Sequence, residues 1–268
     1  MIELIQVTND PAFAQRCERL GGFRIWVDLE RLGKQERQAG RNTFISTHQL
    51  EDVGRVRQAL RSARLMVRVN PLNEGTAAEV DAVLAQGADL LMLPMFRTPA
   101  DLQTFCRIVG GRVPVVPLLE TADALESVEA WAGTPGLGEI YMGLNDLHLS
   151  LGCRFMFEPL ARGLVEHVAG VARATGLPFG FGGIARMDEG ELPGRDVLAE
   201  HVRLGSSAVI LSRTFHRPDA QTPFEDEVAA LRQAEQALAR RGPAQAQADA
   251  SRIAGTIEAI AQRLAARA

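Results

Sequence analysis

Two apolar segments of this chain, residues 115–121 and 139–147, each lead into a carboxylate, Glu120 in the first and Asp146 in the second. A buried strand has no internal reason to end on an acid, because an unpaired charge is costly to remove from water. We therefore expect both acids to point into one shared site. Carboxylates are hard ligands that suit Mg²⁺ or Mn²⁺, and two of them leave most of an octahedral shell open for water and substrate. The alternative for each acid is a helix cap or a solvated loop.

Arg68 lies inside another apolar run, residues 65–69. A guanidinium within a strand is costly unless an anion meets it. Arg68 is therefore a candidate catalytic and substrate-binding residue, which would clamp a substrate carboxylate or an oxyanion that develops during the reaction. The structural alternative is a salt bridge to Asp28 or Glu120.

Eight short β-type runs alternate with amphipathic helical patterns and would position these residues. They cover residues 2–7, 23–29, 65–69, 90–94, 115–120, 139–144, 178–183 and 208–211. Eight βα units in one domain of this length predict an α/β fold, a parallel (β/α)8 TIM barrel over residues 1–220. Polar residues gather at the C-terminal ends of these runs, the face on which barrels of this kind build their sites. A doubly wound sheet would need an early glycine-rich fingerprint, which the sequence lacks.

The last two runs end in Gly182-Gly183 and in Ser212-Arg213. Many barrels bind phosphate at this position, with Arg186 and Arg213 as the expected partners here. The alternative is tight packing under a loop.

Residues 221–268 carry two further helical patterns. In the second, Ile253, Ile257, Ile260 and Leu264 recur at spacings of four, three and four, as in an a/d seam. We expect these C-terminal helices to pack on their own barrel or on a neighbouring subunit, and the second option predicts a homo-oligomer.

Composition narrows the possible partners. A net charge of −4 argues against nonspecific binding to nucleic acid. Three separated cysteines without CxxC spacing indicate neither a disulfide framework nor a zinc site. An acid near the N-terminus does not fit a secretory signal, and no apolar run is long enough to span a membrane. We expect a soluble, unprocessed, cytoplasmic protein that acts on small molecules.

Five stretches, in order, resemble the HpcH/HpaI aldolase and citrate lyase β-subunit family of metal-dependent carbon–carbon lyases. They are residues 27–30, 67–70, 88–94, 118–121 and 143–147, the last followed by Leu151-Gly152. The first resembles the family's Asp-x-Glu, the second its strand-borne arginine, the fourth its metal-binding Glu-Thr, and the fifth its glycine–x–x–Asp-Leu signature. The resemblance extends from about residue 20 to about residue 215.

The resemblance implies a modified TIM barrel, often with its last helix exchanged between subunits. It also implies a Mg²⁺ or Mn²⁺ ion held by Glu120 and Asp146 and chelated by a 2-oxo acid such as pyruvate. Gly143, Asn145 and Asp146 would bind the substrate, the last two through backbone amides. Arg68 would offset negative charge on an oxygen of the reacting groups.

One position departs from the family pattern. In the aldolase branch a histidine that acts as acid and base follows the Asp-x-Glu, and in citrate lyase-type members another acid follows it. Here the next residue is Arg31. Asp28 is retained as a catalytic candidate, and His48 is the most economical substitute for the proton-transfer group because it lies on the loop after the second strand. The alternative for His48 is an ordinary residue at a helix start.

Three functions follow as expectations. The first is a divalent-metal-dependent aldolase that makes or breaks a carbon–carbon bond next to a 2-oxo acid enolate, with an aldehyde as the other substrate. The second is a CoA-thioester lyase of the citrate lyase β or malyl-CoA lyase type. The third, of another class, is a barrel that binds a metabolite without turning it over. Arg31 in place of the family's histidine keeps the non-catalytic barrel open as an alternative. The retained charges at Glu120, Asp146 and Arg68 weigh against that alternative.

Overall fold

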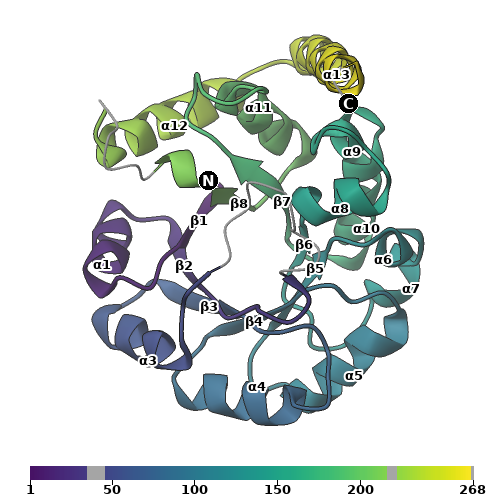
Figure 1. Ribbon diagram of the computed structural model, residues 1–268. Helices are drawn as coiled ribbons and strands as arrows, with labels where there is room; N and C mark the ends of the chain where they lie inside the picture. The colour runs from purple at the N-terminus through teal and green to yellow at the C-terminus, as the bar shows by residue number, and fades with distance from the viewer. Residues whose placement is uncertain (35–45, 216–221, 267–268) are drawn as a thin grey trace. The chain divides into compact units, whose positions relative to one another are not determined.

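The computed structural model describes residues 1–34, 46–215 and 222–266, and its strands confirm the expected α/β fold. Eight parallel strands are hydrogen-bonded in chain order as a closed barrel (Figure 1). Each expected strand is present, with ends within two residues of the prediction. The strands are β1 (Glu3–Val7), β2 (Phe23–Asp28), β3 (Arg64–Arg68), β4 (Leu90–Leu93), β5 (Val115–Leu119), β6 (Ile140–Met142), β7 (Phe179–Ile184) and β8 (Ala208–Leu211).

Helices follow the strands along the chain. They are α1 (Pro11–Leu20), α3 (Leu50–Ala59), α4 (Thr76–Ala85), α5 (Pro99–Val109), α6 (Ala122–Glu126), α7 (Val128–Trp131), α8 (Leu144–Ser150), α9 (Glu158–Ala161), α10 (Leu164–Thr175), α11 (Gly194–Leu204), α12 (Phe224–Leu238) and α13 (Pro243–Ala265), with a 3-10 turn, η1, at Arg213–Phe215. Among the described residues, none of these helices is both long and apolar enough to cross a membrane.

The chain divides into two compact units. The N-terminal unit is Leu4–Tyr141, and the C-terminal unit is Met1–Glu3 with Met142–Ala268. The expected domain boundary at residue 220 lies outside the described residues, so the division into 1–220 and 221–268 stays a prediction.

Strand register in the N-terminal unit places the candidate side chains on one face of the sheet. Asp28 pairs with Arg68, and Arg68 pairs with Met92. Met92 pairs in turn with Val116. Side chains alternate between the two faces of a strand, so Glu120, four residues after Val116, continues on the same face as Asp28 and Arg68. The strands are buried on both faces, as in parallel sheets covered by helices, here α3, α4 and α5 (Figure 1).

The C-terminal unit covers the apolar stripe that could have been an oligomer seam. Ile253, Ile257 and Ile260 of α13 are buried within this chain. Helix α13 packs against α9 and α11 of the same unit. Of the two expected arrangements, the described residues therefore show the helix on its own chain, and the homo-oligomer stays a prediction.

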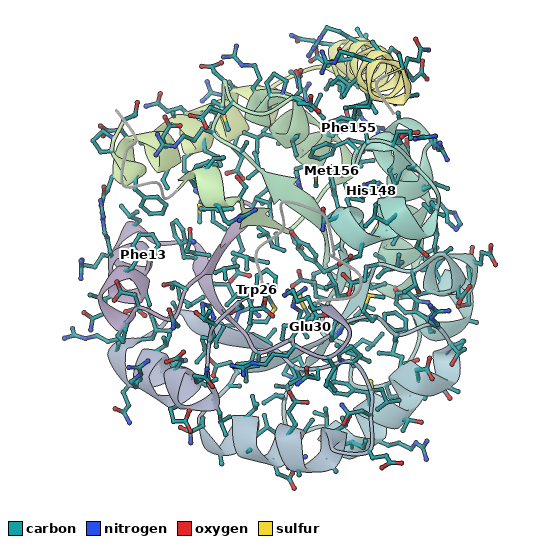
Figure 2. All side chains as sticks on the ribbon, viewed as in Figure 1. Phe13, Trp26, Glu30, His148, Phe155 and Met156 are labelled. Atoms are coloured by element: carbon teal, nitrogen blue, oxygen red, sulfur yellow. The ribbon has the colours of Figure 1, made fainter. Side chains whose placement is uncertain are left out.

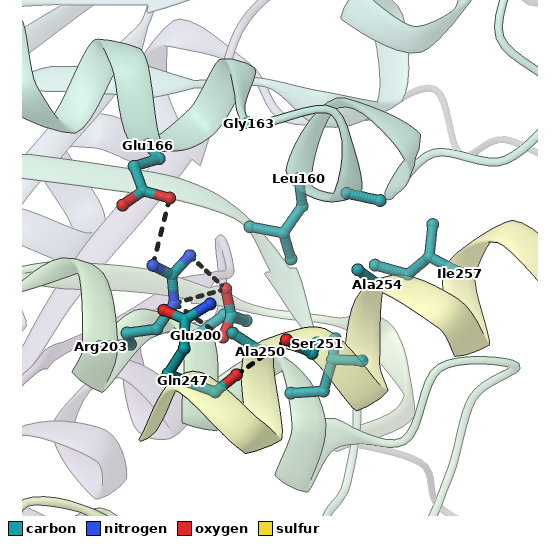
Figure 3. Close-up of a pocket in the computed structure, with 12 residues that line it drawn as sticks. Leu160, Gly163, Glu166, Glu200, Arg203, Gln247, Ala250, Ser251, Ala254 and Ile257 are labelled. Carbon is teal, nitrogen blue, oxygen red and sulfur yellow. Dashed lines mark hydrogen bonds and ion pairs between the residues drawn. The ribbon is translucent and has the colours of Figure 1, made fainter. Parts of the chain in front are cut away.

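A cavity of about 190 Å³ lies beside α13 in the C-terminal unit (Figure 3). Arg203 bridges Glu200 at 2.7 Å and Glu166 at 3.2 Å there. Gln247 and Ser251 of α13 also line the cavity. Its main charges are paired with one another, so it is a packing feature of the helix layer.

Among the described histidines of the C-terminal unit, His201 of α11 is the most deeply buried. Its ring stacks on Phe181 with centroids 3.8 Å apart, and its Nδ1 lies 2.8 Å from Ser206 Oγ. Burial lowers the pKa of His201 to about 3. The native fold therefore requires the neutral imidazole.

We predict that His201 makes the fold acid-sensitive. Between pH 6.5 and about 3 the unfolded chain binds a proton that the folded chain does not, so stability is complete above pH 6.5 and falls as the pH drops. The contribution is about 1.4 kcal/mol per pH unit. The free energy of unfolding in urea, determined for wild type and His201→Asn at pH 7.5 and pH 5, measures this contribution.

The His201→Asn protein should be less stable at pH 7.5, because it loses the ring stack, yet lose less stability on acidification than wild type. Exposed His167 gives the matched control, and His167→Asn should keep the wild-type acid sensitivity. Equal losses in wild type and His201→Asn would contradict the prediction.

Candidate functional site

The arginine at the end of β3 and the aspartate at the end of β2 form a two-pronged ion pair in the N-terminal unit. Arg68 donates from Nε to Asp28 Oδ1 at 2.8 Å and from Nη2 to Asp28 Oδ2 at 2.7 Å. The guanidinium carbon lies 4.8 Å from the ring centroid of Trp26, which faces the same side of β2. The fork of a guanidinium matches a carboxylate, and this geometry fixes the plane of Arg68. The salt bridge to Asp28 that the sequence offered as an alternative is thus present.

Glu30 and Lys34 complete a buried cluster of four charges. Arg68 Nη1 lies 3.2 Å from Glu30 Oε2. Lys34 Nζ lies 2.8 Å from Asp28 Oδ2 and 3.4 Å from Glu30 Oε2. Trp26 and Glu30 lie on the strand side of α3 and α4 (Figure 2). Two carboxylates thus meet two cations with little exposure to solvent.

The segment after β2 is folded back by specific contacts that hold Lys34 in this cluster. Asn70 Oδ1, from the loop after β3, accepts hydrogen bonds from the backbone N–H groups of Arg31 and Leu32 at 2.8 and 3.0 Å. Gly33 has a φ of 69°, a conformation that favours glycine, and reverses the chain just before Lys34. The sequence did not predict this role of Lys34. Lys34 is four residues after Glu30, but the pairing rule for that spacing applies to regular helices, and this segment turns at Gly33.

Electrostatic interactions keep Asp28 and Arg68 ionised. Burial alone would raise the pKa of Asp28, but Arg68 and Lys34 hold it well below its usual range by charge and by hydrogen bonds. Burial likewise opposes the charge on Arg68, whereas Asp28, Glu30 and Glu120 raise its pKa. Arg68 therefore stays a cation within reach of the charge on Glu120.

Glu120 follows β5 and is buried, as expected for a strand-end acid with a partner. Its Oε1 accepts a hydrogen bond from the backbone N–H of Met95 at 3.0 Å. Met95 has a φ of 55°, the only positive φ of a non-glycine residue in the described part of the chain. Such a conformation is strained for a residue with a side chain and is frequent at functional sites. Thr121 caps α6 and bonds to the carbonyl of Phe96, which fixes the strand end next to Glu120.

Gly143, Asn145 and Asp146 lie together at the start of α8 in the C-terminal unit. Gly143 is the N-cap, and the backbone N–H groups of Asn145 and Asp146 fall in the first turn, where a helix offers them no partner. Asp146 Oδ1 is buried and has no hydrogen-bond partner. An orphaned carboxylate oxygen is unusual unless it meets a cation, so this residue fits the chemistry of a metal ligand.

The described residues hold no group of three or more His, Cys, Asp or Glu side chains suited to a metal. A site with only two protein carboxylates, whose other coordination positions are open, would not count as such a group of three. Glu120 and Asp146 belong to different compact units, so their pairing as ligands of Mg²⁺ or Mn²⁺ stays a prediction.

His48, the expected proton-transfer group, is buried just before α3. Its Nδ1 accepts a hydrogen bond from the backbone N–H of Asp28 at 3.1 Å, which places the proton of the neutral ring on Nε2. Burial lowers the pKa of His48, assisted by Lys34 and opposed by Asp28 and Asp52. His48 is thus a neutral ring that can donate from Nε2, whereas its basic nitrogen is occupied.

Arg31 lies beside His48 and contacts it. Its Nη2 donates to the carbonyl of His48 at 2.9 Å. Both residues line a cavity of about 190 Å³, together with Leu29, Gln49, Leu50, Asn70, Glu79, Ala82 and Val83. The residue that departs from the family pattern therefore helps to hold the loop that carries His48.

The two arginines expected to bind phosphate lie in different surroundings. Arg186 is buried, and its guanidinium donates to the carbonyls of Thr214, Phe215 and Thr222 and lies 3.6 Å from Glu227. These contacts hold the chain after β8, as in the packing alternative, and phosphate binding at this position stays a prediction. Arg213 lies exposed at the start of η1.

Comparison with known sequences agrees with this geometry. Residues 8–177, more than half of the chain, match the family described as HpcH/HpaI aldolase/citrate lyase. A (3S)-malyl-CoA thioesterase of Cereibacter sphaeroides is 29% identical over 150 residues, which cover 55% of this chain and 50% of that protein. The match thus spans half the length of this relative.

Solved structures share the fold. An HpcH/HpaI aldolase from Desulfitobacterium hafniense superposes with a TM-score of 0.61 at 13% identity, over 90% of this chain and 94% of that chain. A citrate lyase β subunit from M. tuberculosis, complexed with oxaloacetate and magnesium, gives a TM-score of 0.59 at 17% identity, over 88% of this chain and 97% of that chain. At these identities the structures support the barrel and nothing finer. The family match carries the assignment, and the chain belongs to the HpcH/HpaI aldolase/citrate lyase family.

Proposed function

We propose that this protein is a divalent-metal-dependent carbon–carbon lyase that acts next to the enolate of a 2-oxo acid such as pyruvate. One observation carries the proposal. Arg68 is buried, locked in plane by Asp28, and lies on the same sheet face as Glu120. A charged set of this kind is costly to build for stability alone, whereas a site that offsets developing negative charge requires it.

Glu120 and Asp146 are the residues that would hold Mg²⁺ or Mn²⁺, and the orphaned Oδ1 of Asp146 supports this role. When bound, the cation would polarise the keto group of the 2-oxo acid and favour the enolate. The backbone N–H groups of Asn145 and Asp146, with Gly143 leading into them, would bind the substrate carboxylate. Arg68 would offset charge on the keto or aldol oxygen.

The reaction is one step read in two directions. In cleavage the proton of the aldol hydroxyl passes to water, the hydroxyl oxygen becomes the aldehyde carbonyl, and the electrons of the broken carbon–carbon bond pass to the 2-oxo acid as its enolate. In condensation the enolate carbon attacks the aldehyde, and the new alkoxide takes a proton back from water. His48 would donate a hydrogen bond from Nε2 to that oxygen, because its Nδ1 is already bonded to Asp28 N–H.

A CoA-thioester lyase of the citrate lyase or malyl-CoA type is the second candidate. The likeness to a (3S)-malyl-CoA thioesterase favours it. The same enolate-stabilising residues would serve an acetyl thioester, so the two candidates differ in substrate and share the charged cluster.

Proton exchange separates the two candidates. We expect the methyl protons of pyruvate to exchange for deuterium when the protein, Mg²⁺ or Mn²⁺ and pyruvate are incubated in D₂O, as followed by NMR. Exchange of acetyl-CoA protons alone would favour the thioester lyase. Absence of metal-dependent exchange with both compounds would contradict a lyase of either type.

We predict that Glu120→Gln weakens Mn²⁺ binding by more than about 10-fold and abolishes metal-dependent turnover, since the variant removes a charged ligand but keeps the shape of the side chain. Calorimetric titration with Mn²⁺ measures the affinity. Exposed Glu126 on α6 supplies the control, because Glu126→Gln should leave affinity and turnover unchanged. If Glu120→Gln kept the wild-type Mn²⁺ affinity and activity, Glu120 would not be a ligand of the metal.

We predict that His48→Gln retains activity within about 10-fold, whereas His48→Ala loses about 100-fold or more. Glutamine can accept from Asp28 N–H through its oxygen and donate through its nitrogen, so it reproduces both hydrogen bonds of the neutral imidazole. Steady-state rates of the two variants provide the measurement. Equal, large losses in both would show that His48 carries a proton and is more than a hydrogen-bond donor.

A further inference from the structure

Lys34 is the only lysine in a chain with 29 lysines and arginines together. It is also buried, with 3% of its surface exposed, although long cations usually keep their charged ends in water. Apart from the histidines, all the other cationic side chains are arginines. The one side-chain ammonium of the protein thus lies inside the candidate site.

The geometry explains why an ammonium suits this position. Asp28 already meets the fork of Arg68 along one edge. The remaining cation must reach Asp28 Oδ2 and Glu30 Oε2 at once, which Lys34 Nζ does at 2.8 and 3.4 Å. An ammonium is a compact point charge with three donors, whereas a second planar guanidinium would need more room.

Lys34 balances the charge of the cluster. Asp28 and Glu30 contribute two negative charges, and Arg68 alone would leave one of them without a partner. A buried charge that loses its partner is strongly destabilising, so the cluster would have to move or take up a proton. Arg68 contacts both acids, and it is the group that would move toward the one left unpaired.

We propose that Lys34 is a positioning residue of the lyase site: by offsetting Glu30, it holds Arg68 against Asp28 in the orientation that serves the substrate. The inference rests on the proposed function and adds a residue to it. Lys34 acts through Asp28, Glu30 and Arg68 and does not itself carry the reacting proton.

Four variants test the charge balance. Lys34→Met should lower kcat by roughly 10- to 100-fold, as expected for a residue that orients a catalytic group, and Glu30→Gln should also lower it. The double variant Lys34→Met/Glu30→Gln restores a neutral cluster and should recover most of the wild-type kcat. Lys34→Arg keeps the charge and should be impaired less than Lys34→Met. Arg112→Met, which removes a cation from an exposed pair with Asp81, is the control and should match wild type.

The pH profile separates positioning from a purely structural role. Asp28 is faced by Arg68 from β3, by Glu30 and Lys34 from its own segment and by His48 from the segment before α3, while Glu120 acts on Arg68 from β5. Removing Lys34 withdraws a charge that holds the pKa of Asp28 down. The acid limb of kcat should therefore move to higher pH in Lys34→Met and return in the double variant.

A single lysine also permits a test without turnover. Protein labelled with ¹³C only in lysine should give one Cε signal by NMR, from the carbon bonded to the ammonium. This signal should shift in Glu30→Gln and stay unchanged in Arg112→Met. A lysine signal that is the same in wild type and Glu30→Gln would show that the ion pair between Lys34 and Glu30 is absent, and it would overturn the proposal.

The outcomes distinguish the two hypotheses. Wild-type protein without metal-dependent exchange overturns the lyase, and the positioning role falls with it even if the NMR signal confirms the ion pair. Active wild-type protein whose Lys34→Met variant keeps full kcat, or whose double variant is as slow as Lys34→Met, overturns the role of Lys34 and leaves the lyase intact. Restored kcat and pH profile in the double variant support both.

Discussion

The N-terminal unit depends on the balance between two carboxylates and two cations that are buried together at the ends of β2 and β3. Asp28 and Glu30 are tolerable there only because Arg68 and Lys34 meet them, and the cations are tolerable for the same reason. Such a cluster contributes little net stability compared with apolar packing, but it has few alternative arrangements. The orientation of Arg68 is therefore set before any substrate arrives, and preorganised charge of this kind is what stabilises developing charge in a reaction.

The backbone serves this cluster as much as the side chains do. Asn70 ties the loop after β3 to the segment after β2, and His48 accepts from the N–H of Asp28. Helix α3 begins next to His48 with a capping box between Gln49 and Asp52, which fixes the loop that carries the histidine. The site thus rests on short contacts between consecutive βα units, and the barrel order of the strands places those contacts next to each other.

The sequence predicted the strands well because each is a compact apolar run, and a parallel barrel buries both faces of every strand. It offered an ion pair with Asp28 or Glu120 as the structural alternative for Arg68, since a guanidinium in a strand needs an acid nearby. It did not predict Lys34, because the return of that side chain depends on a turn at Gly33 that pairing rules for regular helices do not describe. For Arg186 the sequence left packing and phosphate binding open for a related reason: an arginine after a strand can bind carbonyls of its own chain as readily as a phosphate, and composition does not separate the two.

The left-handed conformation of Met95 has a consequence for how this protein can change by mutation. Glycine would adopt the same φ at lower cost, so a substitution there is expected to stabilise the chain while loosening the N–H that bonds to Glu120. Selection for thermal resistance and selection for catalysis would then favour different residues at one position. A library of variants ranked by melting temperature alone would enrich glycine at position 95, although glycine holds the carboxylate of Glu120 less firmly. Stability and activity would therefore favour different residues at this position.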